Sequence, residues 1–214
     1  MTLVEQIRAL NIFPYAFHIT RIENLRGICA AKKLVARNQI DCTSFSDISE
    51  PSVQKIRAQK VVPQSGRPLH DYVPFFLTFK APMVAMRQTQ NEELVYIQIG
   101  LDLFTRINGC FLTDGNATNA NTKFEPFDRP DALKILDLSV LYKVGYSGDK
   151  EKSRTKAAEL LVPDSVPLSE IKTLIFYGSG GRDKGLEIIK DFGIKPAIKV
   201  WPKYFFESRP IGLS

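Results

Sequence analysis

One carboxylate lies where the chain otherwise places apolar residues. Glu159 falls within the run 157–162, which has the composition of a short buried strand. A carboxylate in such a strand is unfavourable unless it has a partner or a chemical task, because an apolar interior solvates charge poorly. Glu159 is therefore a candidate functional group. The alternative is an edge-strand glutamate that faces solvent, with Lys156 as its neighbour.

A histidine and a threonine lie at the junction between a predicted strand and a predicted helix. The strand covers 15–19 and carries His18, while Thr20 and Glu23 have the spacing of a capping box that opens the helix. Backbone N–H groups at the start of a helix bind phosphate or ribose oxygens well. This junction is a candidate nucleotide site, and the alternative is a core histidine whose hydrogen bonds are all satisfied.

A long polar segment follows the second predicted helix. Residues 37–70 are punctuated by Asp, Ser, Pro and Gln, with one predicted helix around 52–59 that carries Lys55 and Arg57. A weakly structured segment of this length inside a compact domain is typical of a functional lid or binding loop. The alternative is a plain surface insertion.

Aromatic residues beside basic ones form another candidate binding region. Residues 69–79 are rich in aromatics, and 75–79 is predicted to be a central strand. Such a stripe normally belongs to the core, but aromatics beside a cation such as Lys80 can also stack on nucleobases. A second basic segment, 143–156, leads directly to Glu159.

Length and composition indicate one soluble globular domain. The chain has 214 residues, of which 44% are hydrophobic and 24% charged. Its net charge of +6 permits nucleic-acid binding without requiring it. No apolar run approaches the roughly 20 residues that span a bilayer, and the N-terminus does not resemble a secretory signal. Three widely spaced cysteines predict neither a disulfide framework nor a zinc site, which fits a reducing cytoplasm.

The order of predicted elements favours an α+β fold. Many short strands are interrupted by helices without a regular strand-helix alternation, which argues against a doubly wound parallel sheet. Residues 116–122 are predicted to be a polar loop with no packing signal, and 178–181 a flexible glycine-rich connector. Further elements are predicted as helices at 102–107, 129–136 and 184–191 and as strands at 94–99, 110–113, 174–177 and 198–200.

Taken together, these segments resemble the DarT family of DNA ADP-ribosyltransferase toxins. The resemblance runs from about residue 13 to 201 and depends on the combined order and spacing of short motifs, each of which is weak alone. The matching segments are Phe17-His18-Ile19-Thr20 with Glu23-Asn24-Leu25, Val61-Val62-Pro63, Leu69-His70-Asp71-Tyr72-Val73-Pro74-Phe75-Phe76, Pro82-Met83 and Ala158-Glu159-Leu160-Leu161-Val162.

The resemblance implies a single ADP-ribosyltransferase-like domain over 1–214, with central split antiparallel or mixed sheets and surrounding helices. Such an enzyme takes NAD as its substrate, needs no metal, and attaches ADP-ribose to a base of single-stranded DNA. Segment 37–66 corresponds to the family's loop that closes over NAD. Segment 143–158 corresponds to the loop that holds the DNA.

The resemblance also implies roles for individual residues. His18 and Thr20 match the family's H-x-T element, which contacts the nicotinamide-side ribose and the nicotinamide amide, and Asn24 matches a position near the NAD cleft. Arg57 falls on the catalytic and NAD-binding arginine when a one-residue gap is allowed, and Glu159 falls on the catalytic glutamate. The expected DNA-binding residues are Tyr72, Phe75, Lys80, Lys152, Arg154 and Lys156.

These implied roles are chemically sensible. Cleavage of the nicotinamide glycosidic bond leaves positive charge on the ribose, which a carboxylate such as Glu159 can stabilise. The same carboxylate can accept the proton of an attacking base nitrogen, a contribution typically of about 10²–10⁴ in rate. Arg57 can polarise a base carbonyl while remaining cationic.

The resemblance leaves the target base open between thymidine and guanosine. It further implies a cytoplasmic, membrane-free toxin, taken here as a monomer, that a separate antitoxin with ADP-ribosyl hydrolase activity neutralises. Two alternatives remain open at this point. One is an NAD-using RNA-modifying enzyme similar to an RNA 2'-phosphotransferase, and the other is a catalytically inactive nucleic-acid-binding module that keeps the fold.

Overall fold

The protein is built around one large mixed β-sheet, described here from a computed structural model over residues 3–40, 45–79, 81–143 and 148–206. Cys42 and Lys80 lie outside these ranges. A separate two-stranded sheet pairs β2 (Lys33–Val35) with β8 (Ser165–Pro167). The strands of the large sheet, in spatial order, are β10 (Ala197–Val200), β9 (Ile171–Phe176), β4 (Leu94–Gly100), β1 (Tyr15–Arg21), β3 (Tyr72–Phe76), β7 (Glu159–Pro163), β5 (Phe111–Thr113) and β6 (Phe124–Pro126).

The large sheet is split near its middle. Strand β1 pairs with β4 along its whole length, but it pairs with β3 only at Phe17 and Phe76. Strand β3 instead pairs with β7 from Tyr72 to Phe76. The sheet therefore consists of two halves whose strands β1 and β3 pair at one position. This confirms the predicted α+β class with split sheets.

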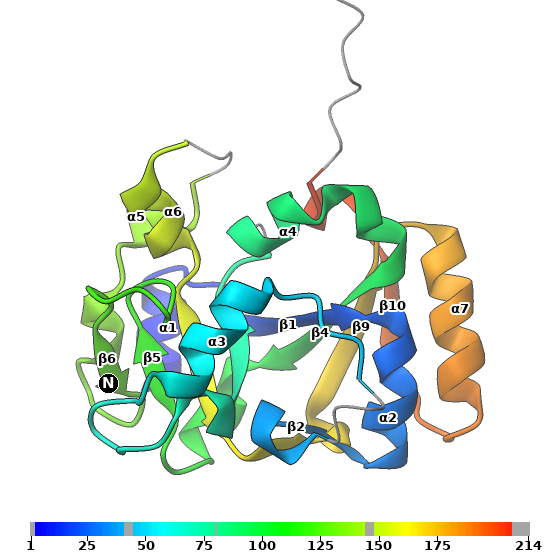
Figure 1. The fold of residues 1–214 in the computed structure, drawn as a ribbon, viewed down its shortest axis with the longest axis horizontal. Coiled ribbons are helices and arrows are strands. Elements are labelled where there is room, and N and C mark those ends of the chain that lie inside the picture. The colour runs from blue at the N-terminus through cyan, green and yellow to red at the C-terminus, as the bar shows by residue number, and fades with distance from the viewer. Residues whose placement is uncertain (1–2, 41–44, 80, 144–147, 207–214) are drawn as a thin grey trace, which may run out of the picture.

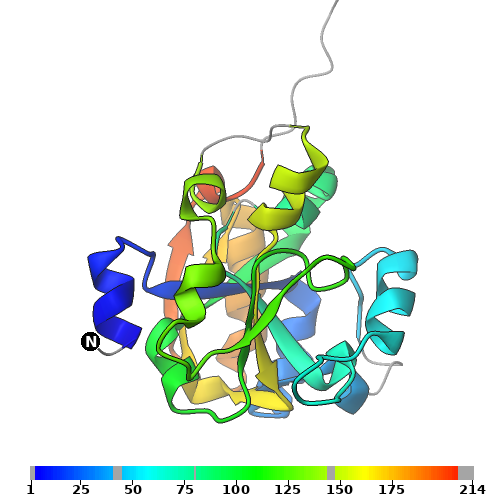
Figure 2. The same ribbon diagram turned by 90° about the vertical axis from the view of Figure 1, so that its left-hand side faces the viewer.

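Within the described ranges, helices α1 to α7 surround the sheet (Figures 1 and 2). Helices α3 and α1 lie on opposite sides of the central strands, as Figure 2 shows, and α7 packs on α2, β9 and β10. Their bounds are α1 Leu3–Ala9, α2 Leu25–Ala30, α3 Pro51–Gln59, α4 Pro82–Met86, α5 Leu138–Leu141, α6 Lys150–Lys156 and α7 Ser179–Lys190. Short 3₁₀ turns connect several of these elements.

Strand β4 shows why the sheet is buried on both faces. All seven of its residues are buried, and its apolar side chains alternate between two hydrophobic clusters. Val95 and Ile97 join the cluster that contains Phe75, whereas Tyr96 joins the cluster that contains Phe17. This alternation is the two-residue period of a β-strand with apolar layers on both sides.

The strand predicted at 75–79 instead covers Tyr72–Phe76. The prediction followed the aromatic residues of 75–79, whereas the strand begins earlier and includes Pro74, which lacks the N–H that a central strand normally contributes. In the structure, β1 pairs with β3 only at Phe76. A backbone N–H at position 74 would therefore have no hydrogen-bond acceptor on β1. The split in the sheet therefore tolerates a proline in a central position.

Other departures from the predicted elements involve short or glycine-containing segments. Residues 179–181 form the first turn of α7 and are not a flexible connector, because the Gly181 N–H donates to the Glu92 carboxylate at 3.2 Å. The helices predicted at 102–107 and 129–136 are short 3₁₀ turns. Strands β6 and β8, each three residues long, were not predicted because so short a run has no clear period.

Three further observations bear on the expected class of protein. Within the described ranges, no helix is long and apolar enough to cross a bilayer. The same residues contain no group of three or more His, Cys, Asp or Glu side chains arranged to hold a metal ion. Cys29 and Cys110 are buried free thiols, and burial raises the pKa of Cys110 to about 12.

Candidate active site

A cavity of about 250 Å³ opens beside the split in the sheet. Its walls come from β1, the segment after β2, α3, β3, the loop after β5, and β7. His18 and Thr20, from early in the chain, line it together with Arg57 and with Glu159, from late in the chain. Four of the residues proposed from the sequence thus face one space, which is the arrangement that a shared reaction requires.

Glu159 is the most enclosed charged group of this cavity, with a side chain only 3% exposed. Its Oε2 accepts a hydrogen bond from Arg57 Nη1 at 3.0 Å, and its Oε1 accepts one from the Ala117 backbone N–H at 3.1 Å. The Glu159 backbone N–H donates to Thr113 Oγ1 at 2.8 Å. Because Glu159 is the first residue of β7, the strand fixes its backbone while its side chain reaches the cavity.

Arg57 brings hydrogen-bond donors that the protein does not fully use. Its side chain is 11% exposed, and Nη1 contacts both oxygens of Glu159. The Nη2 atom is buried and has no hydrogen-bond partner among the described residues. A buried donor without a partner is costly, so a ligand that supplies an oxygen at this position gains a strong, charge-assisted hydrogen bond.

The surroundings of His18 fix its tautomer. Nδ1 lies 2.9 Å from the Pro74 carbonyl oxygen. A carbonyl can only accept, so Nδ1 carries the hydrogen and Nε2 keeps a lone pair. Burial lowers the pKa of His18 to about 4, and the positive charge of Arg57 contributes in the same direction. His18 is therefore a neutral acceptor that suits a sugar hydroxyl.

Asn24 does not line the cavity but ties two of its walls together. Its Nδ2 donates to Thr20 Oγ1 and to the Ser46 carbonyl, both at 2.8 Å, and its Oδ1 accepts from the Ser46 N–H at 3.0 Å. The predicted cofactor-binding residue thus acts through its neighbours. It joins the start of the β1–helix junction to the segment 37–66.

Segment 37–66 borders the cavity, as expected of a closing loop. Arg87 holds it from the far side, donating to the Ile48 carbonyl and to Glu50, both at 2.9 Å. Residues 41–44 of this segment lie outside the described part of the structure. Residues between 37 and 57, which include the first part of helix α3, form one wall of the cavity.

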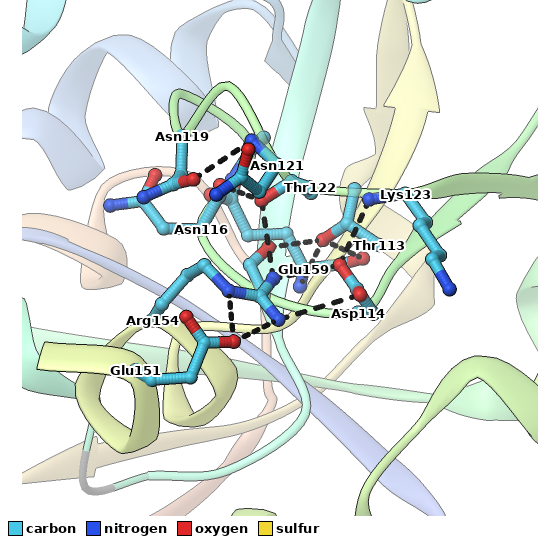
Figure 3. Close-up of polar contacts among 12 residues, drawn as sticks. Thr113, Asp114, Asn116, Asn119, Asn121, Thr122, Lys123, Glu151, Arg154 and Glu159 are labelled. Carbon is cyan, nitrogen blue, oxygen red and sulfur yellow. Dashed lines mark hydrogen bonds and ion pairs between the residues drawn. The ribbon is translucent and has the colours of Figure 1, made fainter.

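The loop 114–123 is the main feature that sequence reasoning missed. It contains the range predicted to have no packing signal, yet Ala117 is fully buried and its N–H binds Glu159. Figure 3 shows the polar contacts that hold this loop against α6 and β7. At its centre, Arg154 Nη1 lies 2.8 Å from Asp114 Oδ1, and both side chains are 11% exposed. Thr113-Asp114-Gly115-Asn116, a turn sequence beside a strand, was the available signal.

Several residues proposed to bind DNA have other contacts in this structure. Phe75 is fully buried, and its ring packs against His18 and Phe104, so no face is open for stacking on a base. Tyr72 is only 2% exposed, with its ring edge-to-face against Phe111. Phe75 belongs to the core, so its proposed stacking on DNA is not supported. Tyr72 is also largely buried but lines the cavity, and its contact with DNA stays a prediction.

The basic residues of the segment before Glu159 differ from one another. Arg154 is paired with Asp114 and Glu151, and Lys156 is buried with its Nζ 2.7 Å from the Lys143 carbonyl. These two cations hold the loop and the segment in place, so their proposed phosphate contacts are not supported. Lys152 is 49% exposed, and its contact with DNA stays a prediction, whereas Lys80 and residues 144–147 lie outside the described ranges.

The geometry supports chemistry at an anomeric carbon. A buried carboxylate, a cation with an unused donor and a neutral imidazole converge on a cavity large enough for part of a dinucleotide. The carboxylate can stabilise an oxocarbenium-like sugar and accept a proton, as in glycoside chemistry. Nothing in this arrangement requires a metal.

Comparison with known proteins gives consistent results. A family model described as ssDNA thymidine ADP-ribosyltransferase, DarT, matches residues 17–206. A DNA ADP-ribosyl transferase of Thermus sp. (strain 2.9) is 29% identical over 185 residues, which cover 82% of this chain and 87% of that protein. A DNA ADP-ribosyl transferase of Thermus aquaticus is 30% identical over 160 residues, 71% of this chain and 69% of that protein.

Two solved structures share the fold. The DarT of Thermus sp. 2.9 in complex with ADP-ribosylated ssDNA superposes with a TM-score of 0.83 at 24% identity, covering 90% of this chain and 96% of that one. The same protein in complex with NAD⁺ gives a TM-score of 0.76, covering 90% and 98%. The split sheet and the helices around it are therefore an architecture already seen in solved proteins.

Proposed function

The chain belongs to the DarT family of single-stranded DNA thymidine ADP-ribosyltransferases, and on that premise we propose that it transfers ADP-ribose from NAD to N3 of thymidine in single-stranded DNA. Thymidine carries one N–H on its base, at N3, so N3 is the nitrogen that can exchange a proton for a sugar. The observation that carries the proposal is the convergence of His18, Arg57 and Glu159 on one cavity.

The proposed reaction breaks the bond between the ribose C1' and nicotinamide and forms a bond from C1' to thymine N3. The electron pair of the broken bond neutralises the pyridinium, so nicotinamide leaves as a neutral molecule. The N3 proton goes to Glu159, which is held by Arg57 and Ala117. The products are ADP-ribosylated DNA, nicotinamide and one proton.

The residues of this chain divide the work between binding and proton transfer. The free Nε2 lone pair of His18 accepts a hydrogen bond from a ribose hydroxyl. The unused Nη2 of Arg57 donates to a carbonyl oxygen of the target base, which makes the neighbouring N–H more acidic. The carboxylate of Glu159 stabilises positive charge on the sugar and then serves as the general base.

We test the proposal with labelled NAD and single-stranded oligonucleotides. The wild-type protein is expected to transfer label to thymidine-containing DNA, and Glu159→Gln to reduce the rate by about 10²–10⁴-fold or more, because the amide cannot accept the proton. NAD binding should persist in Glu159→Gln. The matched control is Glu187→Gln on the exposed side of α7, which should retain full activity.

Two results would reject the proposal. Label found only on protein or only on RNA would exclude DNA as the substrate. Undiminished transfer by Glu159→Gln would exclude the assigned base.

The proposal extends to a biological setting. As an enzyme that modifies DNA, the protein acts in the cytoplasm, as a monomer, and is a toxin held in check by an antitoxin that removes ADP-ribose. The existence of a solved Thermosipho africanus DarTG, of which this chain covers 52%, supports such a pairing. Expression of the wild-type protein is expected to arrest growth, and expression of Glu159→Ala is not. Equal growth in both cultures would contradict the toxin assignment.

A further inference from the structure

Asn116 presents a fixed pair of hydrogen-bond donors to the cavity. It is half-buried and lines the cavity beside Ala157 and Glu159. Its Oδ1 accepts from the Thr118 N–H at 2.9 Å and from Thr118 Oγ1 at 2.7 Å. The oxygen end of the amide is therefore committed to the loop, and among the described residues Nδ2 has no partner.

The backbone of Asn116 is held as firmly as its side chain. Its N–H donates to the Arg154 carbonyl at 2.9 Å, and its own carbonyl accepts from Thr122 Oγ1 at 2.6 Å. The next residue, Ala117, donates its N–H to Glu159 Oε1. Figure 3 shows Asn116 and Glu159 within this one network of contacts. The position of the Asn116 amide relative to the Glu159 carboxylate is thus built into the fold.

The side chains of Asn116, Glu159 and Arg57 present to the cavity a hydrogen-bond donor, an acceptor and a donor, in that order. Glu159 Oε1 accepts from the Ala117 N–H of the loop that carries Asn116, and Arg57 Nη1 approaches from the other side, 3.0 Å from Oε2 and 3.3 Å from Oε1. On the loop side the unused donor is Asn116 Nδ2. On the helix α3 side the unused donor is Arg57 Nη2.

The edge of thymine has the complementary sequence. It reads carbonyl, N–H, carbonyl, or acceptor, donor, acceptor, around N3. The corresponding edge of guanine reads carbonyl, N–H, amino, or acceptor, donor, donor. An amide donor placed against the third position forms a hydrogen bond with the carbonyl of thymine. The same donor would face the amino group of guanine, and two donors facing each other are unfavourable in a desolvated site.

We propose that Asn116 is the residue that selects the target base, by donating Nδ2–H to one carbonyl of thymine while Glu159 takes the N3 proton and Arg57 holds the other carbonyl. The inference rests on the proposed function and deepens it. It assigns the preference for the carbonyl, N–H, carbonyl edge of thymine over the edge of guanine to one side chain of the loop 114–123. A site built to bond a polar group discriminates strongly against an analogue that lacks it.

Two substitutions of the same residue test the assignment. Asn116→Ala removes the donor and should lower kcat/KM for a thymidine oligonucleotide about 10-fold or more while the Kd for NAD stays unchanged. Asn116→Asp keeps an oxygen for Thr118 and so preserves the loop, but it replaces the donor with an acceptor. It should raise the ratio of guanosine to thymidine modification by about 10-fold or more.

The matched control is Asn121→Asp. It makes the same change of charge at an exposed position of the same loop and should leave the preference between bases unchanged. A structural effect of the substitution at 116 would also appear as a change in NAD affinity or in the free energy of unfolding. Both are measured for every variant.

Oligonucleotides that carry 2-thiothymidine or 4-thiothymidine identify the bonded carbonyl. Sulfur is a poor acceptor, so one of the two analogues should show a penalty in the wild type that largely disappears in Asn116→Ala. The altered acidity of the thio base affects both enzymes equally and cancels in this comparison. Penalties that persist in full for both analogues would overturn the inference, as would a thymidine rate for Asn116→Ala within about twofold of wild type.

These outcomes separate the inference from the proposed function. If the wild type modifies no thymidine at all, the proposed function fails before Asn116 is tested. If the wild type modifies thymidine and Asn116→Asp keeps the wild-type ratio between thymidine and guanosine, only the assignment of Asn116 is overturned.

Discussion

His18 shows how a single residue can be tuned by its surroundings to stay neutral. Its Nδ1 donates to the Pro74 carbonyl, and burial together with Arg57 lowers its pKa to about 4. An unfolded histidine titrates near 6.5. Between these two values the unfolded chain binds a proton that the folded chain does not, so the free energy of unfolding must fall as the pH falls from about 6.5 to 4.

We therefore predict that the neutral state of His18 causes part of the loss of stability at acidic pH. His18→Asn keeps a donor for the Pro74 carbonyl but cannot titrate, so the part of the acid destabilisation due to His18 should vanish. A pKa difference of this size corresponds to at most about 3–4 kcal/mol, less where solvent enters the cavity. Urea unfolding of both proteins at several pH values from 7 to 4 measures the difference. Parallel curves would contradict a lowered pKa of His18 in the folded protein.

At this scale the sequence identifies charged and unusual residues better than it identifies backbone groups. His18 and Glu159 stood out because each is a polar residue in an apolar strand. Ala117 did not, because it acts through its N–H, which every residue except proline has. Phe75 was assigned to DNA because an aromatic in a strand gives no indication of which of its faces is covered.

The loop 114–123 and helix α6 act together as an element that positions the catalytic carboxylate. The Asp114–Arg154 pair is largely buried, and Asp114 Oδ1 also accepts from the Lys123 N–H at 2.9 Å. Asp114→Asn keeps an acceptor for Lys123 but removes the charge that faces Arg154. We expect a loss of about 1–3 kcal/mol in stability, because Arg154 retains Glu151 as a second partner.

The same variant should separate binding from catalysis. If the loop positions Glu159 through Ala117, Asp114→Asn should lower kcat about 10-fold at a temperature where it is folded, with little change in the Kd for NAD. The control is Asp131→Asn, which breaks an exposed ion pair with Lys134 and should change neither quantity. A kcat equal to that of wild type would mean that the loop serves stability alone.

Helices and strands could be predicted where the hydrophobic pattern extends over enough residues to show its period. Strands β1, β4 and β9 alternate or run apolar over six or seven residues, and each lies close to its predicted position. The prediction placed β3 too late in the chain. The strand contains Pro74, which fits a central strand here because β1 and β3 pair at only one position. The split between these two strands is a long-range feature with no local signal.

The whole molecule depends on two half-sheets that share one site. His18 lies on the half that contains β1, β4, β9 and β10, and Glu159 lies on the half that contains β3, β7, β5 and β6. Sequence order alone could not place them together, because 141 positions separate them in the chain (159 minus 18). The resemblance to a family supplied the missing long-range information.

Because the halves form one sheet, a defect at its outer end should destabilise the whole domain. Gly185 of α7 packs on β9 so closely that an added Cβ would lie 2.5 Å from the Phe176 ring. Gly185→Ala should therefore lower the free energy of unfolding by about 1–3 kcal/mol. The control, Gly27→Ala in α2, meets no atom within 4 Å and should raise it by about 0.5–1 kcal/mol, since alanine favours a helix.

The two variants also test whether the halves unfold together. The chain has one tryptophan, Trp201, which follows β10 and so reports on one half-sheet, whereas far-ultraviolet circular dichroism reports on all elements. In a single cooperative domain the two signals change at the same denaturant concentration in wild type and in Gly185→Ala. A tryptophan transition that moves alone would show that β9, β10 and α7 unfold separately. His18 could then leave the cavity while Glu159 stays in place.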